Sequence, residues 1–110
     1  MDKLDRYRTA IRQVMKPHLS PYSVGDIEVS EVIDSEHDHF QVFAAGWANG
    51  HYHHGPTVSM QIKNGKIWIH HNGTDSDLAQ ELVSLGVPKN DIVLGWQAPA
   101  MRKFTEYAVG

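Results

Sequence analysis

An Asn-Gly dipeptide at positions 64 and 65 is the feature that most restricts how this chain can fold. Before it, Val58, Met60 and Ile62 alternate with polar side chains, and a second apolar stretch follows it over residues 66–71. Alternation with a period of two is typical of a strand with one buried face. Asparagine and glycine tolerate the positive φ angles of a two-residue type I′ turn. An antiparallel hairpin is therefore predicted around this dipeptide.

Two more strands are predicted ahead of the hairpin. Ile27, Val29 and Ile33 would point inward, between acidic residues that point outward. Glu31-Val32 interrupts this alternation and predicts a β-bulge. The run from Phe40 to Trp47 is apolar on both faces, as in a central strand. A loop follows over residues 49–56, and the four strands together are expected to form an antiparallel meander.

Helical spacing marks a segment on each side of these strands. The apolar positions at this spacing are Leu4, Tyr7, Ile11 and Val14 in residues 2–16, and Leu78, Leu82 and Leu85 farther along. Thr74 and Asp77 form a capping-box-like pair before the second segment, and Gly86 suits the position just after its end. The segment from Ile92 to Trp96 is expected to be extended or to pack over the sheet, and the tail from Met101 to dock on the core.

The predicted fold class is α+β, within one domain spanning residues 1–110: an N-terminal helix, a four-stranded antiparallel meander sheet, and a C-terminal helix packed on the sheet. A length of 110 residues, of which 41% are hydrophobic, suits a single core. An exposed edge on so small a sheet favours pairing into a homodimer. The chain lacks cysteine, a signal peptide and any apolar run long enough to span a membrane, so we expect a cytoplasmic protein without membrane contact.

The charges are unevenly distributed along the chain, whose net charge is −3. Residues 26–38 carry acidic side chains without a single lysine or arginine, which suits docking to another protein. The candidate partner-binding residues are Trp68, Glu28, Asp34 and Glu36. The predicted N-terminal helix is basic, and direct DNA binding through it is the alternative. The candidate nucleic-acid contacts are Arg6, Arg8, Arg12 and Lys16. Trp68 is expected to be exposed beside His70, as an anchor for protein–protein contact.

Histidine is unusually frequent, with eight in the chain. His51, His53 and His54 are weak candidate metal ligands, since imidazole is a common ligand and His51 and His53 would share a face in extended backbone. A metal-dependent enzyme is therefore a third hypothesis. No nucleophile elbow, phosphate-binding loop or zinc motif is present, so no catalytic residues and no cofactor are predicted.

Several strings in the chain are similar to one known family. They are Gly65-Lys66-Ile67-Trp68-Ile69, Asn72-Gly73-Thr74, Gly86-Val87-Pro88 and Asp91-Ile92-Val93-Leu94-Gly95, together with residues 2–15, 31–47 and 102–110. In these strings the chain resembles the XisI family, the fdxN-element excision controlling factors of cyanobacteria, over nearly its whole length.

The resemblance implies a non-enzymatic role beside a companion, an XisH-like protein with a nuclease-like fold. The pair would control the excision of a DNA element by a separate recombinase during heterocyst differentiation. DNA would then be reached indirectly, through the partner. The resemblance implies no catalytic residues, so it favours the partner-binding hypothesis over direct DNA binding and metal-dependent catalysis.

Overall fold

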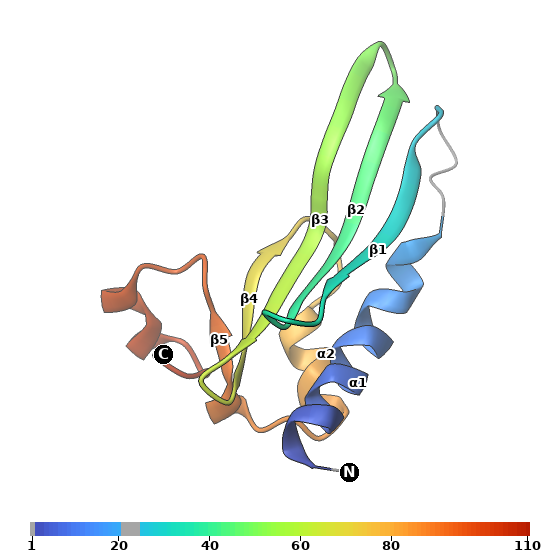
Figure 1. Ribbon diagram of the computed structural model, residues 1–110. Helices are drawn as coiled ribbons and strands as arrows, with labels where there is room; N and C mark the ends of the chain where they lie inside the picture. Colours follow the sequence, from blue (N-terminus) through green and yellow to red (C-terminus); the bar gives the residue numbers. More distant parts are fainter. Residues whose placement is uncertain (1, 21–24) are drawn as a thin grey trace.

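A five-stranded mixed sheet forms the centre of the protein, and both α-helices pack on one of its faces (Figure 1). The computed structural model describes residues 2–20 and 25–110. With η denoting a 3₁₀ helix, the elements in chain order are α1 (Lys3–Met15), η1 (Lys16–Leu19), β1 (Glu28–Asp34), β2 (His39–Ala48), β3 (His51–Lys63), β4 (Lys66–Asn72), α2 (Leu78–Ser84), η2 (Lys89–Asp91), β5 (Ile92–Leu94) and η3 (Pro99–Phe104).

The sheet order is β1-β2-β3-β4-β5, and its first four strands form the predicted antiparallel meander. The predicted strand count was wrong by one, because β5 pairs in parallel with β4, setting Ile92 beside Ile67. Parallel pairing requires a crossover, which α2 and η2 provide. A strand of three residues is too short to show alternation, so its pairing was not readable from the sequence.

Both predicted α-helices are present, and the second differs from its prediction at its start. The Asp2 side chain caps α1 by accepting a hydrogen bond of 2.8 Å from the Asp5 backbone N–H. Asp77 caps α2 in the same way, whereas Thr74 lies in the preceding turn and donates its hydroxyl to the Asn72 side chain. The capping role predicted for Thr74 was therefore wrong. Gly86 ends α2 as predicted, with a φ of +99°.

The second helix is also not the last element, because β5 and η3 follow it. The prediction that this helix is the C-terminal element was therefore wrong. No helix among residues 2–20 and 25–110 is long and apolar enough to cross a membrane.

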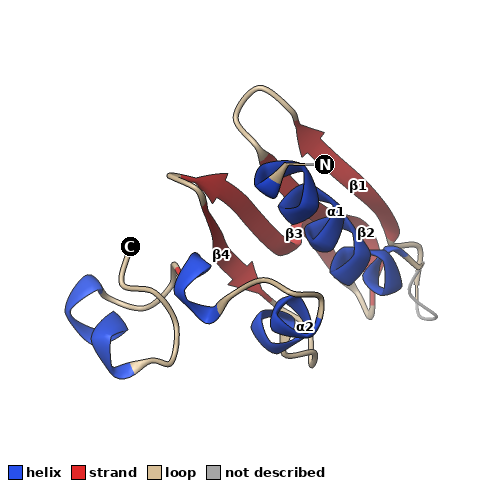
Figure 2. Cartoon of the chain, turned by 90° about the horizontal axis from the view of Figure 1, so that it is seen from below, coloured by secondary structure: helices blue, strands red, loops and turns tan. Residues whose placement is uncertain are grey.

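The main core lies between the helices and the sheet, which Figure 2 shows from below. The apolar face of α1 is buried as predicted, with Ile11 and Met15 fully inaccessible. Opposite them lie alternate residues of the central strands. The fully buried side chains of the sheet and α2 in this core are Val42, Val58, Met60, Ile67, Ile69, Leu78, Leu82 and Ile92.

Asn-Gly turns close two hairpins of the sheet, β2–β3 and β3–β4. Asn64-Gly65 has positive φ angles of 55° and 74° and joins β3 to β4 as predicted. Asn49-Gly50 has nearly the same angles, 52° and 76°, and joins β2 to β3. The loop predicted over residues 49–56 was therefore wrong, because β3 already begins at His51.

The predicted bulge at Glu31-Val32 was also wrong, because β1 pairs with β2 without a break in register. Glu31 points toward α1, where it forms an ion pair with Arg12, so the strand continues regularly through an inward-facing charge. The register shifts lie instead between Val42 and Phe43 and between Ser59 and Met60.

The C-terminal tail docks back on the body, as predicted. The Ala108 backbone N–H donates a hydrogen bond of 2.8 Å to the Ile92 carbonyl, and Ala108 forms a parallel bridge with Val93. This contact covers the edge of β5. The tail therefore protects one edge of the sheet, whereas the outer edge of β1 bears no strand among the described residues.

Gly46 in β2 generates a stability prediction. Its φ is +146°, and a Cβ there would lie 2.1 Å from the Asp26 carbonyl oxygen. Gly55 in β3 has a φ of +157° with open space around a built Cβ, so it is a matched control. We expect Gly46→Ala to lower the free energy of unfolding by about 3 kcal/mol and Gly55→Ala by about 1 kcal/mol, measured by urea unfolding. Equal losses would show that Gly46 does not approach Asp26 closely.

Candidate functional site

The basic residues of the first helix are partly engaged within the protein. Arg8 holds Asp38 with two hydrogen bonds, of 2.9 and 3.2 Å, and also contacts Asp5 at 2.7 Å. Arg12 contacts Glu31 at 3.0 Å. The basic helix and the acidic residues 26–38 are therefore partly joined to each other. Among the described residues, Arg6 and Lys16 have no acidic partner.

The predicted acidic contacts lie on or beside the edge strand β1. Glu28, Asp34 and Glu36 are all exposed. Asp34 organises the β1–β2 turn, accepting hydrogen bonds from the Glu36 backbone and from the backbone and ring of His37. The contact with the His37 ring, aided by these backbone bonds, lowers the pKa of Asp34 despite the opposing effect of desolvation. Asp34 is thus accessible to a partner, and it also stabilises this turn through its hydrogen bonds.

Trp68 is half-buried, so its predicted exposure was wrong. The Lys63 ammonium lies 4.4 Å from the centre of its ring and the Arg102 guanidinium 5.0 Å. Arg102 is anchored by hydrogen bonds to the Gln97 and Gly95 carbonyls, so the returning tail holds it over the indole. An arginine thirty-four positions downstream in a tail without periodicity could not be placed there from the sequence.

The candidate metal ligands lie on the distal part of the β2–β3 hairpin. His53 pairs with Gly46 and His51 with Ala48, which sets both on the helix-side face, while His54 pairs with Ala45 on the other face. Within residues 2–20 and 25–110, no three histidine or acidic side chains gather as a metal site would require. His54 instead packs against aromatic rings.

An aromatic cluster occupies the face of the sheet that turns away from α1 and α2, which we call the open face. Its members come from the hairpin residues 43–56, termed the arm, which rises beyond the other elements in Figure 1. Trp47 and Tyr52 are paired across the strands with ring centres 5.3 Å apart, and they are 60% and 55% exposed. The His54 ring lies 6.2 Å from Tyr52 and 5.0 Å from Phe43. Large exposed rings on a continuous strand surface are typical of protein-binding sites.

The middle of the open face is polar. The His70 ring lies at hydrogen-bond distance from the Gln61 side chain, 3.0 Å, and stacks between Trp68 and His39. Burial lowers the pKa of His70, and the nearby His39 and Lys63 lower it further. Gln41 donates a hydrogen bond to Ser59 beside this group. These side chains form a polar, hydrogen-bonded group beside the aromatic cluster.

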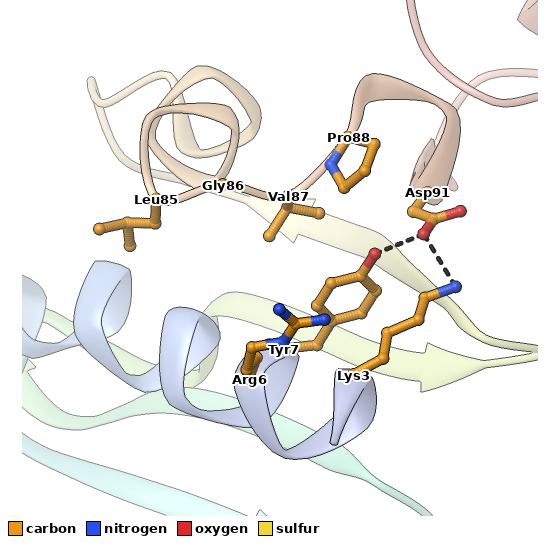
Figure 3. A pocket seen from close by; sticks show the side chains of 8 residues that line it. All are labelled: Lys3, Arg6, Tyr7, Leu85, Gly86, Val87, Pro88 and Asp91. Carbon is orange, nitrogen blue, oxygen red and sulfur yellow. Dashed lines mark hydrogen bonds and ion pairs between the residues drawn. The ribbon is translucent and has the colours of Figure 1, made fainter. Parts of the chain in front are cut away.

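A pocket of about 390 Å³ lies on the opposite side of the protein, between α1 and the α2–β5 connection (Figure 3). Its basic and polar lining comes from successive turns of α1, which place Lys3, Arg6 and Tyr7 on one side. Its apolar lining comes from the end of α2 and the following residues, Leu85 to Pro88. We call it the Arg6 pocket.

Asp91 closes the floor of the Arg6 pocket. Its carboxylate accepts a hydrogen bond from the Tyr7 hydroxyl and forms an ion pair of 3.0 Å with the Lys3 ammonium (Figure 3). Desolvation opposes ionisation of Asp91, but these two donors outweigh it and lower its pKa. Burial, together with the Asp91 carboxylate, raises the pKa of Tyr7 to about 12. Asp91 therefore holds both Lys3 and Tyr7 in place at this pocket.

Neither the aromatic cluster nor the Arg6 pocket was predicted. Asn49-Gly50 was the missed signal for the arm, because it repeats the turn dipeptide used to predict the second hairpin. A strand beginning at His51 would have set Tyr52 opposite Trp47. The pocket had no such signal, since its halves are about eighty residues apart in the chain.

The XisI family profile, described as XisI protein, matches residues 1–109. A XisI-like protein from Anabaena variabilis has a crystal structure with a TM-score of 0.89 and 38% identity, over 97% of this chain and 99% of that one. The fdxN element excision controlling factor XisI from the same organism gives a TM-score of 0.84 and 32% identity, over 99% of this chain and 100% of that one. No curated protein sequence matches this chain.

The contact between Tyr7 and Asp91 predicts a pH-dependent contribution to stability. Tyr7→Phe should lower the free energy of unfolding by about 2 kcal/mol at neutral pH, because a hydrogen bond to a charged carboxylate is lost. The folded-state pKa of Tyr7 is raised from 10.0 to about 12, so its stabilisation is complete below pH 10.0 and is lost as the pH rises through about 12. Urea unfolding over this range should show the difference between the two proteins shrinking.

Tyr107→Phe is the matched control, since burial is the main cause of the raised pKa of Tyr107, and the hydrogen bonds that Tyr107 forms with the Thr105 hydroxyl come from its backbone. It should cost less stability at neutral pH than Tyr7→Phe. A difference between wild type and Tyr7→Phe that stays constant across the alkaline range would contradict the proposed pairing.

Proposed function

The chain belongs to the XisI family, and from that membership we propose that it controls the excision of a DNA element by binding a protein partner. The role in excision that we propose comes from the name of one relative, the fdxN element excision controlling factor XisI. The family name describes a controlling factor, which suggests a non-catalytic role. The partner we propose is a nuclease-like protein of the XisH type, which would supply the chemistry on DNA.

The exposed aromatic pair of the arm is the observation that carries this proposal. Trp47 and Tyr52 contact each other on the open face, yet more than half of each side chain remains accessible. Covering such rings with an apolar partner surface would remove a large area from water. Tryptophan and tyrosine dominate the binding energy of protein interfaces for this reason.

The paired backbone of the arm supports the same role. Asn49-Gly50 closes it with a tight turn, and β1 pairs with β2 as far as Ala45. The rings therefore project from paired backbone, so little conformational entropy is lost when a partner binds. The polar row beside them, which includes Gln41 and His70, could provide the hydrogen bonds at the rim of an interface.

In this proposal the partner contacts DNA, and this chain does not. Arg8 and Arg12 are held by acidic residues, which reduces the positive charge that α1 offers to phosphates. Proteins that hold DNA unaided neutralise several phosphates with free lysine and arginine side chains. Arg6 and Lys16 alone are a weak basis for such binding.

The test is binding to a purified XisH-type protein, measured by calorimetry. Wild type should bind, and the double variant Trp47→Ala/Tyr52→Ala should bind at least about a hundredfold more weakly, as loss of two central rings predicts. Phe104→Ala is the matched control, because Phe104 is 74% exposed but lies on η3, away from the arm.

Equal binding by the double variant and the wild type would refute the arm as the binding surface. Absence of any binding by the wild type would refute the XisH-type partner. Gel shifts with duplex DNA at low salt complete the test, and tight binding by the isolated chain would favour direct DNA contact instead.

A further inference from the structure

We propose that the Arg6 pocket binds one acidic side chain of the protein partner, together with an apolar residue beside it. The inference rests on the proposed function, since it names the chemistry of a second segment of that partner. It concerns a surface on the helix side of the sheet, away from the aromatic cluster of the open face.

Arg6 provides the positive charge that would bind the acidic side chain. Its side chain is exposed and lies over the pocket in Figure 3. The neighbouring cations are already paired, Lys3 with Asp91 and Arg8 with Asp5 and Asp38, whereas Arg6 has no acidic partner among the described residues. A guanidinium group presents a planar set of donors that matches a carboxylate with two parallel hydrogen bonds.

The opposite wall of the pocket is apolar and preformed. Leu85 is 48% exposed, and Val87 and Pro88 continue the wall. Backbone hydrogen bonds from Gly86 to Val83 and from Val87 to Leu82 hold this turn at the end of α2. No atom lies within 4 Å of the position that a Cβ of Gly86 would occupy, so a ligand can approach the backbone there.

The charge balance of the lining favours a single carboxylate over a phosphate chain. Lys3 and Arg6 are opposed by Asp91, which leaves one net positive charge at the pocket. One carboxylate would neutralise it. A nucleic-acid strand would instead bring successive phosphates against the Asp91 carboxylate and the apolar wall, and both contacts are unfavourable. An acidic residue next to a leucine-like residue fits both walls.

The probe is the blocked dipeptide N-acetyl-leucyl-glutamyl amide, titrated into the full chain labelled with ¹⁵N. We expect saturable shifts of the Gly86 and Val87 amide signals. The glutaminyl analogue, which has the same shape without the charge, should bind about tenfold more weakly, and so should the glutamyl probe to Arg6→Ala. Lys103→Ala is the matched control, since it removes an exposed cation on η3 and should leave the affinity unchanged.

Equal affinity for the glutamyl and glutaminyl probes, or for wild type and Arg6→Ala, would overturn the proposal. So would tighter binding of inorganic phosphate or of a single-stranded oligonucleotide at this pocket. Thermal unfolding checks that Arg6→Ala is folded, and Arg6→Gln, which keeps a polar side chain at this position and loses the charge, should show the same loss of affinity. The titration uses no partner protein, so its failure is distinguishable from failure of the XisH-type partner to bind.

Discussion

The contact between the apolar face of α1 and the centre of the sheet decides the rest of this structure. Ile11 and Met15 are completely buried against a core that contains Val58 and Met60. Because both helices use the same face, the other face of the sheet is left for the aromatic rings of the arm and for the returning tail. A sheet covered on one side needs a second occupant wherever its other side is apolar.

The ion pairs of α1 orient the helix on this core. Arg12 meets Glu31 and Arg8 meets Asp38, so the helix is tied to β1 and to the β1–β2 turn along one side. On its other side, Tyr7 and Lys3 meet Asp91 just before β5. Exposed ion pairs contribute little free energy individually, but these contacts decide which basic side chains of α1 are left without an acidic partner. Arg6 remains available, and it lines a pocket.

The two surfaces we consider differ in chemistry and lie on opposite sides of the sheet. The arm offers large rings with a polar rim, and the Arg6 pocket offers one positive charge beside an apolar wall. A partner that used both would have to reach around the molecule, and it could be recognised by two weak contacts rather than by one strong contact. Such divided recognition suits a small regulatory protein, because each contact adds selectivity to the other.

Local chemistry in the sequence determined the α+β class, the apolar face of α1, the Asn64-Gly65 hairpin and the stop at Gly86, because periodicity and turn residues act over a few positions. The four antiparallel strands followed from the same signals. Only the tertiary structure decided that β5 joins the sheet in parallel, that Arg102 covers Trp68 and that Arg6 faces Leu85. These contacts join distant segments, and their energies depend on burial and on competing partners, which no short stretch of residues encodes.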